Sequence, residues 1–148
     1  MGSEPIERIR LSDALPEPLS HYTDAVRAAD TLYISGMLAF DAAGSIVGSG
    51  DVVAQTEQIF RHLERVLSHC DAGFENIVKV VVFLMDVNAR PAINEVRKRY
   101  FGEFRPASTL VEVSALAHPD ALVEIEAVAY IPVHEDANPG ATFSNSSP

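Results

Sequence analysis

The apolar residues of segment 52–70 recur at intervals of three and four, the spacing that places side chains on one face of an α-helix. They are Val52, Ile59, Phe60, Leu63, Val66, Leu67 and Cys70. Asp51 precedes them as an N-cap, and Gly73 is expected to end the helix. A second helix is predicted over residues 91–104, because Pro91 suits a first helical turn and an apolar stripe follows it. That stripe consists of Ile93, Val96, Tyr100 and Phe104.

Runs of β-branched and apolar residues predict the strands of the chain. Strands are expected at residues 6–11, 31–36, 77–85, 109–114 and 122–131, the first of them at a sheet edge. The strand at residues 77–85 is apolar on both faces, so both faces must be covered. Its predicted faces are Ile77, Val81, Phe83 and Met85 on one side, and Val78, Val80, Val82 and Leu84 on the other. Pro16 and Pro18 predict a loop after the first strand.

The order of these elements predicts an α+β fold, in which a mixed β-sheet has two helices packed on one face. The opposite face is then uncovered, and it is predicted to pack against other subunits. Together with the strand at residues 77–85, it is expected to include the small apolar row Val123, Ile125, Ala127, Ala129 and Ile131. We expect a single domain over residues 1–134 and a flexible polar C-terminal tail over residues 135–148.

Composition and charge narrow the function. The chain has 148 residues, of which 47% are hydrophobic, enough for one domain with its own core. Its formal net charge of −10 repels phosphate backbones, which argues against nucleic acid as a partner. The longest apolar stretch, residues 80–85, is far shorter than the roughly 20 residues that span a membrane. Cys70 alone cannot form an internal disulfide and no signal-peptide pattern opens the chain, so a cytoplasmic protein is expected.

Metal binding and thiol chemistry are not expected. The 5 histidines are scattered, and neither an HExxH nor a CxxC motif occurs. His62 and His69 lie two turns apart on one face of the first predicted helix and are interpreted as solvated polar positions. Cys70, within the apolar stripe, is assigned a structural role.

Glu124 and Glu126 are the carboxylates best placed for chemistry. They are two residues apart and project from the same face of a strand, with Glu112 a candidate neighbour on another strand. Like charges so placed raise each other's pKa, which suits a residue that transfers a proton near neutral pH. A solvated strand face, or pairing with cations across an interface, explains the same pattern, and spacing alone favours this structural explanation.

Several segments resemble the RidA/YjgF family, and together they extend over residues 6–131. They are LYISG at residues 32–36, the strand at 78–86, AIN at 92–94, RPASTLVEV at 105–113 and VEIEA at 123–127. The resemblance implies a chorismate-mutase-like YjgF fold, a homotrimer with a central β-barrel, and inter-subunit clefts for a small-molecule metabolite. It also implies hydrolysis of reactive imines and enamines, of the 2-iminobutanoate/2-iminopropanoate type, without a metal or an organic cofactor.

The same resemblance assigns roles in the cleft. Glu124 would be the catalytic residue that orients the attacking water or exchanges a proton. Ser35 and Gly36 would line the cleft with a hydroxyl group and a backbone N–H. Tyr22 would form a lid from the loop, and Asn94 would contribute from the second helix. Each of these residues has a packing or turn role as its alternative.

The chain departs from the family pattern directly after its Pro-Ala pair. Deaminating members carry an arginine there that binds the substrate carboxylate, whereas this chain has Ser108. Loss of a charged hydrogen bond worth about 1.5–3 kcal/mol predicts weaker carboxylate binding and an altered substrate range. Leu110 stands where many members have a cysteine, which makes this wall of the binding site more apolar. Arg105 would point to the opposite strand face if the strand already runs there, and is not expected to substitute.

Three functions therefore stay open. The first is an imine or enamine deaminase with an altered substrate range. The second, about equally supported, is a non-catalytic metabolite-binding protein of the same fold. The third, the endoribonuclease or translation-inhibitor activity attributed to the family, fits the acidic charge least.

Overall fold

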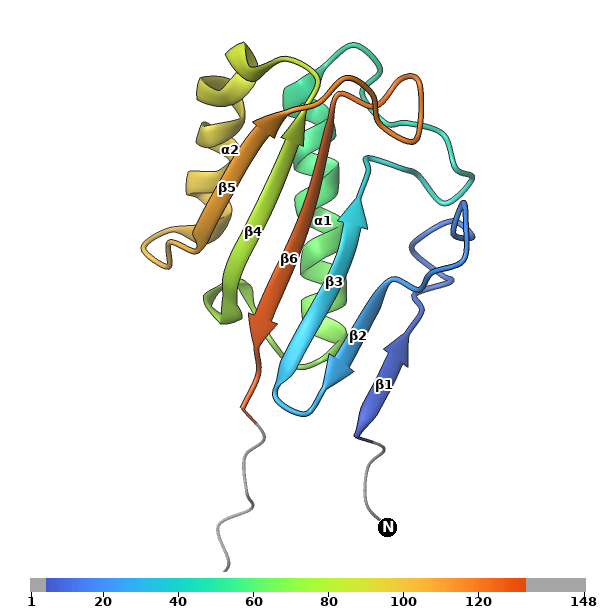
Figure 1. The fold of residues 1–148 in the computed structure, drawn as a ribbon, viewed down its shortest axis with the longest axis vertical. Coiled ribbons are helices and arrows are strands. Elements are labelled where there is room, and N and C mark those ends of the chain that lie inside the picture. Colours follow the sequence, from blue (N-terminus) through green and yellow to red (C-terminus); the bar gives the residue numbers. More distant parts are fainter. Residues whose placement is uncertain (1–4, 133–148) are drawn as a thin grey trace, which may run out of the picture.

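The computed structural model describes residues 5–132, which form one six-stranded sheet and two α-helices (Figure 1). The strands are β1 (Ile6–Ile9), β2 (Ala25–Ala28), β3 (Thr31–Met37), β4 (Ile77–Leu84), β5 (Ala107–Glu112) and β6 (Val123–Tyr130). The helices are α1 (Val52–His69) and α2 (Arg90–Phe101), and short 3₁₀ turns, η1 (Phe74–Asn76) and η2 (Val87–Ala89), lead into β4 and α2. The predicted tail at residues 135–148 lies outside the described residues.

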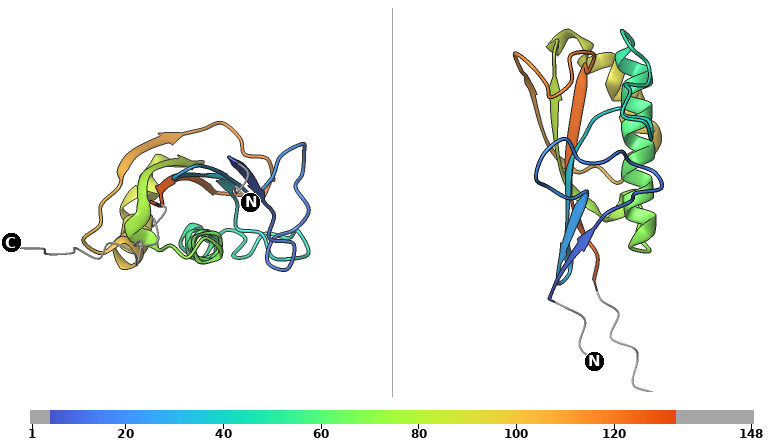
Figure 2. Two further views of the ribbon diagram at one scale, coloured as in Figure 1. Left: turned by 90° about the horizontal axis from the view of Figure 1, so that it is seen from below. Right: turned by 90° about the vertical axis from the view of Figure 1, so that its right-hand side faces the viewer.

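The sheet is mixed, with the strand order β1-β2-β3-β6-β4-β5. β4 and β5 run parallel, and the other neighbouring strands run antiparallel. α1 connects β3 to β4 and α2 connects β4 to β5, and both helices lie on the same side of the sheet (Figure 2). The predicted α+β fold with two helices on one face is therefore confirmed.

α1 begins as predicted but ends differently. The Asp51 carboxylate accepts the N–H groups of Val53 and Ala54 at 3.1 and 3.0 Å, which caps the first turn. At the other end Asp71, with φ 54°, adopts the left-handed conformation that closes a helix. Gly73 has φ −137° and instead starts η1, so the prediction that it ends the helix is wrong. Aspartate tolerates the left-handed region well enough to take the role assigned to glycine.

α2 is shorter than predicted. It ends at Phe101, where Gly102 turns the chain with φ 55°. Phe104, a predicted member of the buried stripe, is 52% exposed, and Phe101 is buried instead. The prediction was wrong because it extended the helical spacing past the glycine that ends the helix.

Two predictions about strand faces are also wrong. A register shift between Ile77 and Lys79 turns Ile77 toward the helices together with Val80, although Ile77 was assigned to the face of Val81. The small apolar row of β6 packs against the helices in the core rather than lying on the uncovered face. That row is Val123, Ile125, Ala127, Ala129 and Ile131.

The uncovered face of the sheet nevertheless carries large apolar groups. The register of β3, β4 and β6 places on it Tyr33, Val81, Phe83, Val128 and Tyr130. Tyr33 and Tyr130 are 52% and 51% exposed in the single chain. In the part of the chain that the structure describes, no helix is long and apolar enough to cross a membrane.

β2 was not predicted, because the segment after the prolines was interpreted as a loop. It is only 4 residues long, and Arg27 interrupts its apolar pattern. Its pairing with β1 on one side and β3 on the other defines it as a strand, and this pairing leaves little local trace in the sequence.

Candidate active site

Glu124 lies near the start of β6 on the uncovered face, opposite Phe83 of β4. Its side chain is half-buried, and burial raises the pKa of its carboxyl group. The nearby charge of Glu126 raises that pKa further, as the two-residue spacing indicated. A carboxyl group with a raised pKa exchanges protons closer to neutral pH, as general acid–base catalysis requires.

Gly36 lies against the Glu124 carboxyl group, where the pairing of β3 with β6 is irregular between Ile34 and Met37. A Cβ atom on Gly36 would lie 2.9 Å from Cδ of Glu124 and closer still to Oε1. Atoms cannot approach so closely without a shift, so any other residue at this position would displace the carboxyl group. The lack of a side chain at Gly36 is therefore part of the site.

Ser35 forms hydrogen bonds that link β3 to the residues directly before β2. Its Oγ donates to the C=O of Thr23 at 2.6 Å, and its N–H donates to the C=O of Asp24 at 3.0 Å. The hydroxyl proton is thus used to hold the backbone, whereas the oxygen keeps its ability to accept a further hydrogen bond.

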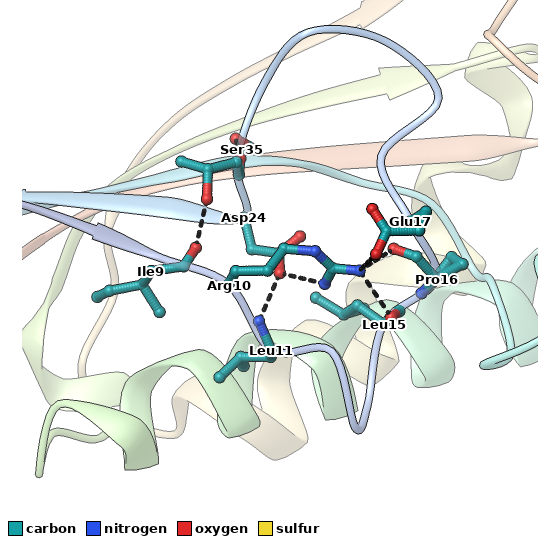
Figure 3. A network of polar contacts seen from close by, with 9 residues as sticks. Ile9, Arg10, Leu11, Leu15, Pro16, Glu17, Asp24 and Ser35 are labelled. Carbon is teal, nitrogen blue, oxygen red and sulfur yellow. Dashed lines mark hydrogen bonds and ion pairs between the residues drawn. The ribbon is translucent and has the colours of Figure 1, made fainter.

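An ion pair between the partly exposed Arg10 and the buried Asp24 fixes the loop between β1 and β2 (Figure 3). Arg10 Nη1 contacts Oδ2 of Asp24 at 2.8 Å, and Arg10 Nη2 donates to the C=O groups of Leu15 and Pro16 at 3.2 and 2.7 Å. Asp24 is 5% exposed, and it also accepts the N–H of Leu11 at 2.7 Å. The buried carboxylate is therefore compensated by two donors, and the loop is tied to the sheet at both ends.

A cavity of about 400 Å³ is lined by this loop and by β3 and β6. Among the predicted site residues it brings together Tyr22, Ser35, Gly36 and Glu124. Glu126 and apolar residues complete the lining, the latter including Leu15, Leu19, Met37, Leu38 and Phe40. A mainly apolar wall with a few polar groups is the usual composition of a small-molecule site.

The other predicted residues do not meet Glu124 within one chain. Asn94 and Ser108 line a second cavity of about 420 Å³ between α2 and the start of β5. Ser108 is in register with Val80 of the core face, and Arg97 Nη2 donates to its Oγ at 2.9 Å. Ser108 therefore lies on the helix side of the sheet and Glu124 on the other side.

Three further candidates lie near β5. Leu110 is also on the helix side, where it packs against the core. Arg105 precedes the first strand residue, Ala107, and lines the same cavity as Ser108. Glu112 accepts the N–H of Val87 at 3.0 Å at the far end of the strand, so it does not join the Glu124 pair.

His62 is 3% exposed, so its interpretation as a solvated residue is wrong. Its Nε2 donates to the C=O of Phe40 at 2.7 Å, and burial lowers the pKa of its imidazole. Cys70 is buried in the core, as its structural role predicted. Over residues 5–132, no three His, Cys, Asp or Glu side chains gather in the way a metal ion requires.

Arg10, Asp24 and Arg97 were missed in the sequence. The ion pair of Arg10 with Asp24 joins residues 14 positions apart, and the second of them precedes a strand that was not recognised. Arg97 offered one local sign, since it follows the buried Ile93 by four positions and so lies on the same side of α2.

The fold and the cavity define a small α+β protein with a carboxyl group held on the uncovered face of its sheet. Residues 12–131 match the family described as endoribonuclease L-PSP. The chain therefore belongs to this family, the RidA/YjgF family that its motifs resembled.

Similar proteins cover almost the whole domain. The 3-aminoacrylate deaminase RutC of Acinetobacter baylyi is 37% identical over 125 residues, which are 84% of this chain and 98% of the relative. A 2-iminobutanoate/2-iminopropanoate deaminase of Capra hircus is 36% identical over 84% of this chain and 90% of the relative. The crystal structure of RidA from the Antarctic bacterium Psychrobacter superposes with a TM-score of 0.76 at 31% identity, covering 87% of this chain and 100% of that chain.

Proposed function

We propose that this protein is a hydrolytic deaminase of small imines and enamines, working in clefts between the subunits of a homotrimer. The observation that carries the proposal is Glu124, a half-buried carboxyl group of raised pKa held against Gly36 in a cavity with apolar walls. Two relatives named as deaminases, at 37% and 36% identity, support the same chemistry. The proposed reaction uses neither a metal nor an organic cofactor.

The main requirement of the proposed reaction is one carboxyl group held in position. A protonated imine is electrophilic at carbon, so water adds to it when Glu124 accepts the proton of that water. The C–O bond forms as the C=N electron pair moves to nitrogen, and Glu124 passes the proton on to that nitrogen. The C–N bond then breaks, the hydroxyl proton leaves with ammonia as ammonium, and a carbonyl group is left. With an enamine, protonated Glu124 first adds a proton to carbon to form the imine.

The separation of the two cavities supports a site shared between subunits, and the trimer is what the family resemblance implies. Tyr22, Ser35, Gly36 and Glu124 line one of them, whereas Asn94 and Ser108 line the other on the far side of the sheet. A neighbouring chain that packs on the uncovered apolar face brings its α2 and β5 toward Glu124, so the cleft would be shared by two chains. Tyr22 would act as its lid, and Leu110 would keep the wall behind Ser108 apolar.

The proposal is tested by generating 2-iminopropanoate in solution and following the release of pyruvate. We expect acceleration by the wild-type protein and a loss of about 10²–10⁴-fold in Glu124→Gln, which keeps the shape but cannot transfer the proton. Glu64→Gln is the matched control, since it removes the same charge from the exposed surface of α1, away from this cavity, and should keep most of the activity. Equal rates for Glu124→Gln and the wild type would contradict the proposal.

A non-catalytic metabolite-binding protein is the second candidate, because Ser108 provides no charge where deaminating members have an arginine. It would be supported if small keto acids bind but no imine is hydrolysed faster than in buffer. An endoribonuclease or translation inhibitor is supported least, given the net charge of −10. The single, buried Cys70 suits the reducing cytoplasm, which is the compartment that we propose.

A further inference from the structure

The second cavity is positively charged although the protein is acidic. The chain has a net charge of −10, yet the charged residues of this cavity are Arg97, Lys98 and Arg105. None of the residues that line it is acidic. A local reversal of charge in a concave site concentrates small anions there.

Arg97 differs from the cations beside it on α2. Lys98 and Arg99 are each paired with a glutamate. Over residues 5–132, no ion pair involves Arg97, whose hydrogen bond goes to the neutral hydroxyl group of Ser108. Arg97 is half-buried, and burial lowers the pKa of its guanidinium group with no carboxylate to offset the effect. A desolvated cation without a counter-charge is unfavourable, and an incoming anion relieves it.

We propose that Arg97 and Ser108 bind the carboxylate group of a small substrate, with α2 supplying the cation that β5 lacks at position 108. Because Ser108 accepts from Arg97, its own O–H proton is free to donate to one ligand oxygen. The remaining N–H groups of the guanidinium can donate to the other oxygen, as in other arginine–carboxylate pairs. This inference rests on the proposed deaminase function and names the residue that would give the site its affinity for a carboxylate.

A carboxylate suits this cavity better than a phosphate dianion. Arg97 is the half-buried cation, whereas Lys98 already has its partner and Arg105 is exposed to water. Among these cations, Arg97 alone is both half-buried and without an ion pair among the described residues, and a single carboxylate neutralises it. The sequence alone predicted that Ser108 weakens carboxylate binding. Arg97 would supply the positive charge that Ser108 lacks.

The test is a titration of the full-length protein with pyruvate, with its neutral analogue pyruvamide, and with inorganic phosphate, followed by NMR. The wild type is expected to prefer pyruvate. Arg97→Gln is expected to raise the Kd for pyruvate roughly ten- to a hundredfold while leaving pyruvamide unchanged. Arg97→Lys, which keeps the charge and loses the planar fork, should fall in between.

The matched control is Arg65→Gln, which removes the same charge from the exposed surface of α1. It should change the Kd less than about twofold, because an exposed charge is screened by salt. Equal weakening in Arg65→Gln and Arg97→Gln would overturn the inference, since the general field of the protein would then explain the binding. Phosphate binding tighter than pyruvate, with the same dependence on Arg97, would overturn the assignment to a carboxylate.

Measurements of pyruvate binding and of imine turnover distinguish a failure of this inference from a failure of the proposed function. If the Kd for pyruvate does not depend on Arg97 while turnover requires Glu124, the inference is overturned and the deaminase proposal stays intact. Pyruvate binding that requires Arg97 in a protein without turnover would support the inference for carboxylate binding and overturn the deaminase proposal.

Discussion

The Glu124 carboxyl group can occupy its position only because Gly36 has no side chain. The carboxyl group occupies the space that a Cβ atom would fill, and burial there raises its pKa. The same contact that makes Glu124 chemically useful thus depends on a single backbone position of β3. We therefore propose that Gly36 positions Glu124.

Gly36→Ala is expected to move the Glu124 carboxyl group and to lower kcat/KM for imine hydrolysis roughly a hundredfold, the cost of a displacement of about 1 Å in a reacting group. The measurement is a double-mutant cycle with Glu124→Gln. If Gly36 acts through Glu124, adding Gly36→Ala to Glu124→Gln should cost nothing further. Fully additive losses, or a wild-type rate for Gly36→Ala, would show that the glycine does not position the carboxyl group.

At the scale of residues, the sequence predicted part of the site. Glu124, Ser35, Gly36 and Tyr22 were assigned by resemblance, and the structure brings them into one cavity. Asp24 was not found, because its partner Arg10 is distant in sequence and a buried ion pair has no local pattern. The burial of His62 was missed for a related reason: its acceptor is a backbone carbonyl of another segment, which carries no sequence information.

Among the elements, α1 carries polar as well as apolar side chains on its buried face, and His62 is one of the polar ones. His62 donates from Nε2 to the carbonyl of Phe40, so its neutral form has an unprotonated Nδ1. That Nδ1 is buried and has no hydrogen-bond partner among the described residues. Protonation at Nδ1 would place a charge in the core beside the segment that follows β3. The neutral imidazole is therefore the form that fits the fold.

Stability should consequently fall in mild acid. Burial lowers the pKa of His62 from its ordinary value of 6.5, so the unfolded chain takes up this proton at a higher pH than the folded chain. The stabilising difference is complete above about pH 6.5 and is lost as the pH falls toward the lower folded-state pKa. In urea unfolding at fixed protein concentration, His62→Gln should lose less stability between pH 7.5 and pH 5.5 than the wild type, whatever its absolute stability.

His21→Gln, at an exposed position, is the control for that experiment and should behave like the wild type. An identical acid-induced loss in the wild type and in His62→Gln would rule out His62 as its source.

The helices and the longer strands were predictable because their patterns are local. Periodic apolar positions and the Asp51 cap fixed the start of α1, and the long apolar run at residues 77–85 indicated β4. β2 and the bulge of β4 depend on pairing with strands distant in sequence, so local patterns did not show them. The end of α1 was predicted at Gly73, whereas Asp71 takes the left-handed position, and the end of α2 was missed because the apolar spacing was followed past Gly102.

For the whole molecule, the decisive feature is that the two cavities open on opposite sides of one sheet. Glu124 lies on the uncovered face, whereas Ser108 and Arg97 lie on the helix side. The sequence correctly predicted an uncovered face but assigned the wrong apolar row to it, since helix-facing and exposed rows alternate along the same strand. This separation is the reason for proposing a site shared between chains.

A mixed-subunit experiment tests this shared site most directly. Glu124→Gln disables one half of each cleft, and Ser108→Trp fills the other half. Each variant alone is expected to be inactive, whereas a mixture of equal amounts, unfolded and refolded together, should form hybrid rings in which about a quarter of the clefts contain two intact halves. We predict recovery of about that fraction of the wild-type rate of imine hydrolysis. Hybrid trimers that form but recover no activity, or a wild-type protein that is fully active as a monomer, would contradict the account.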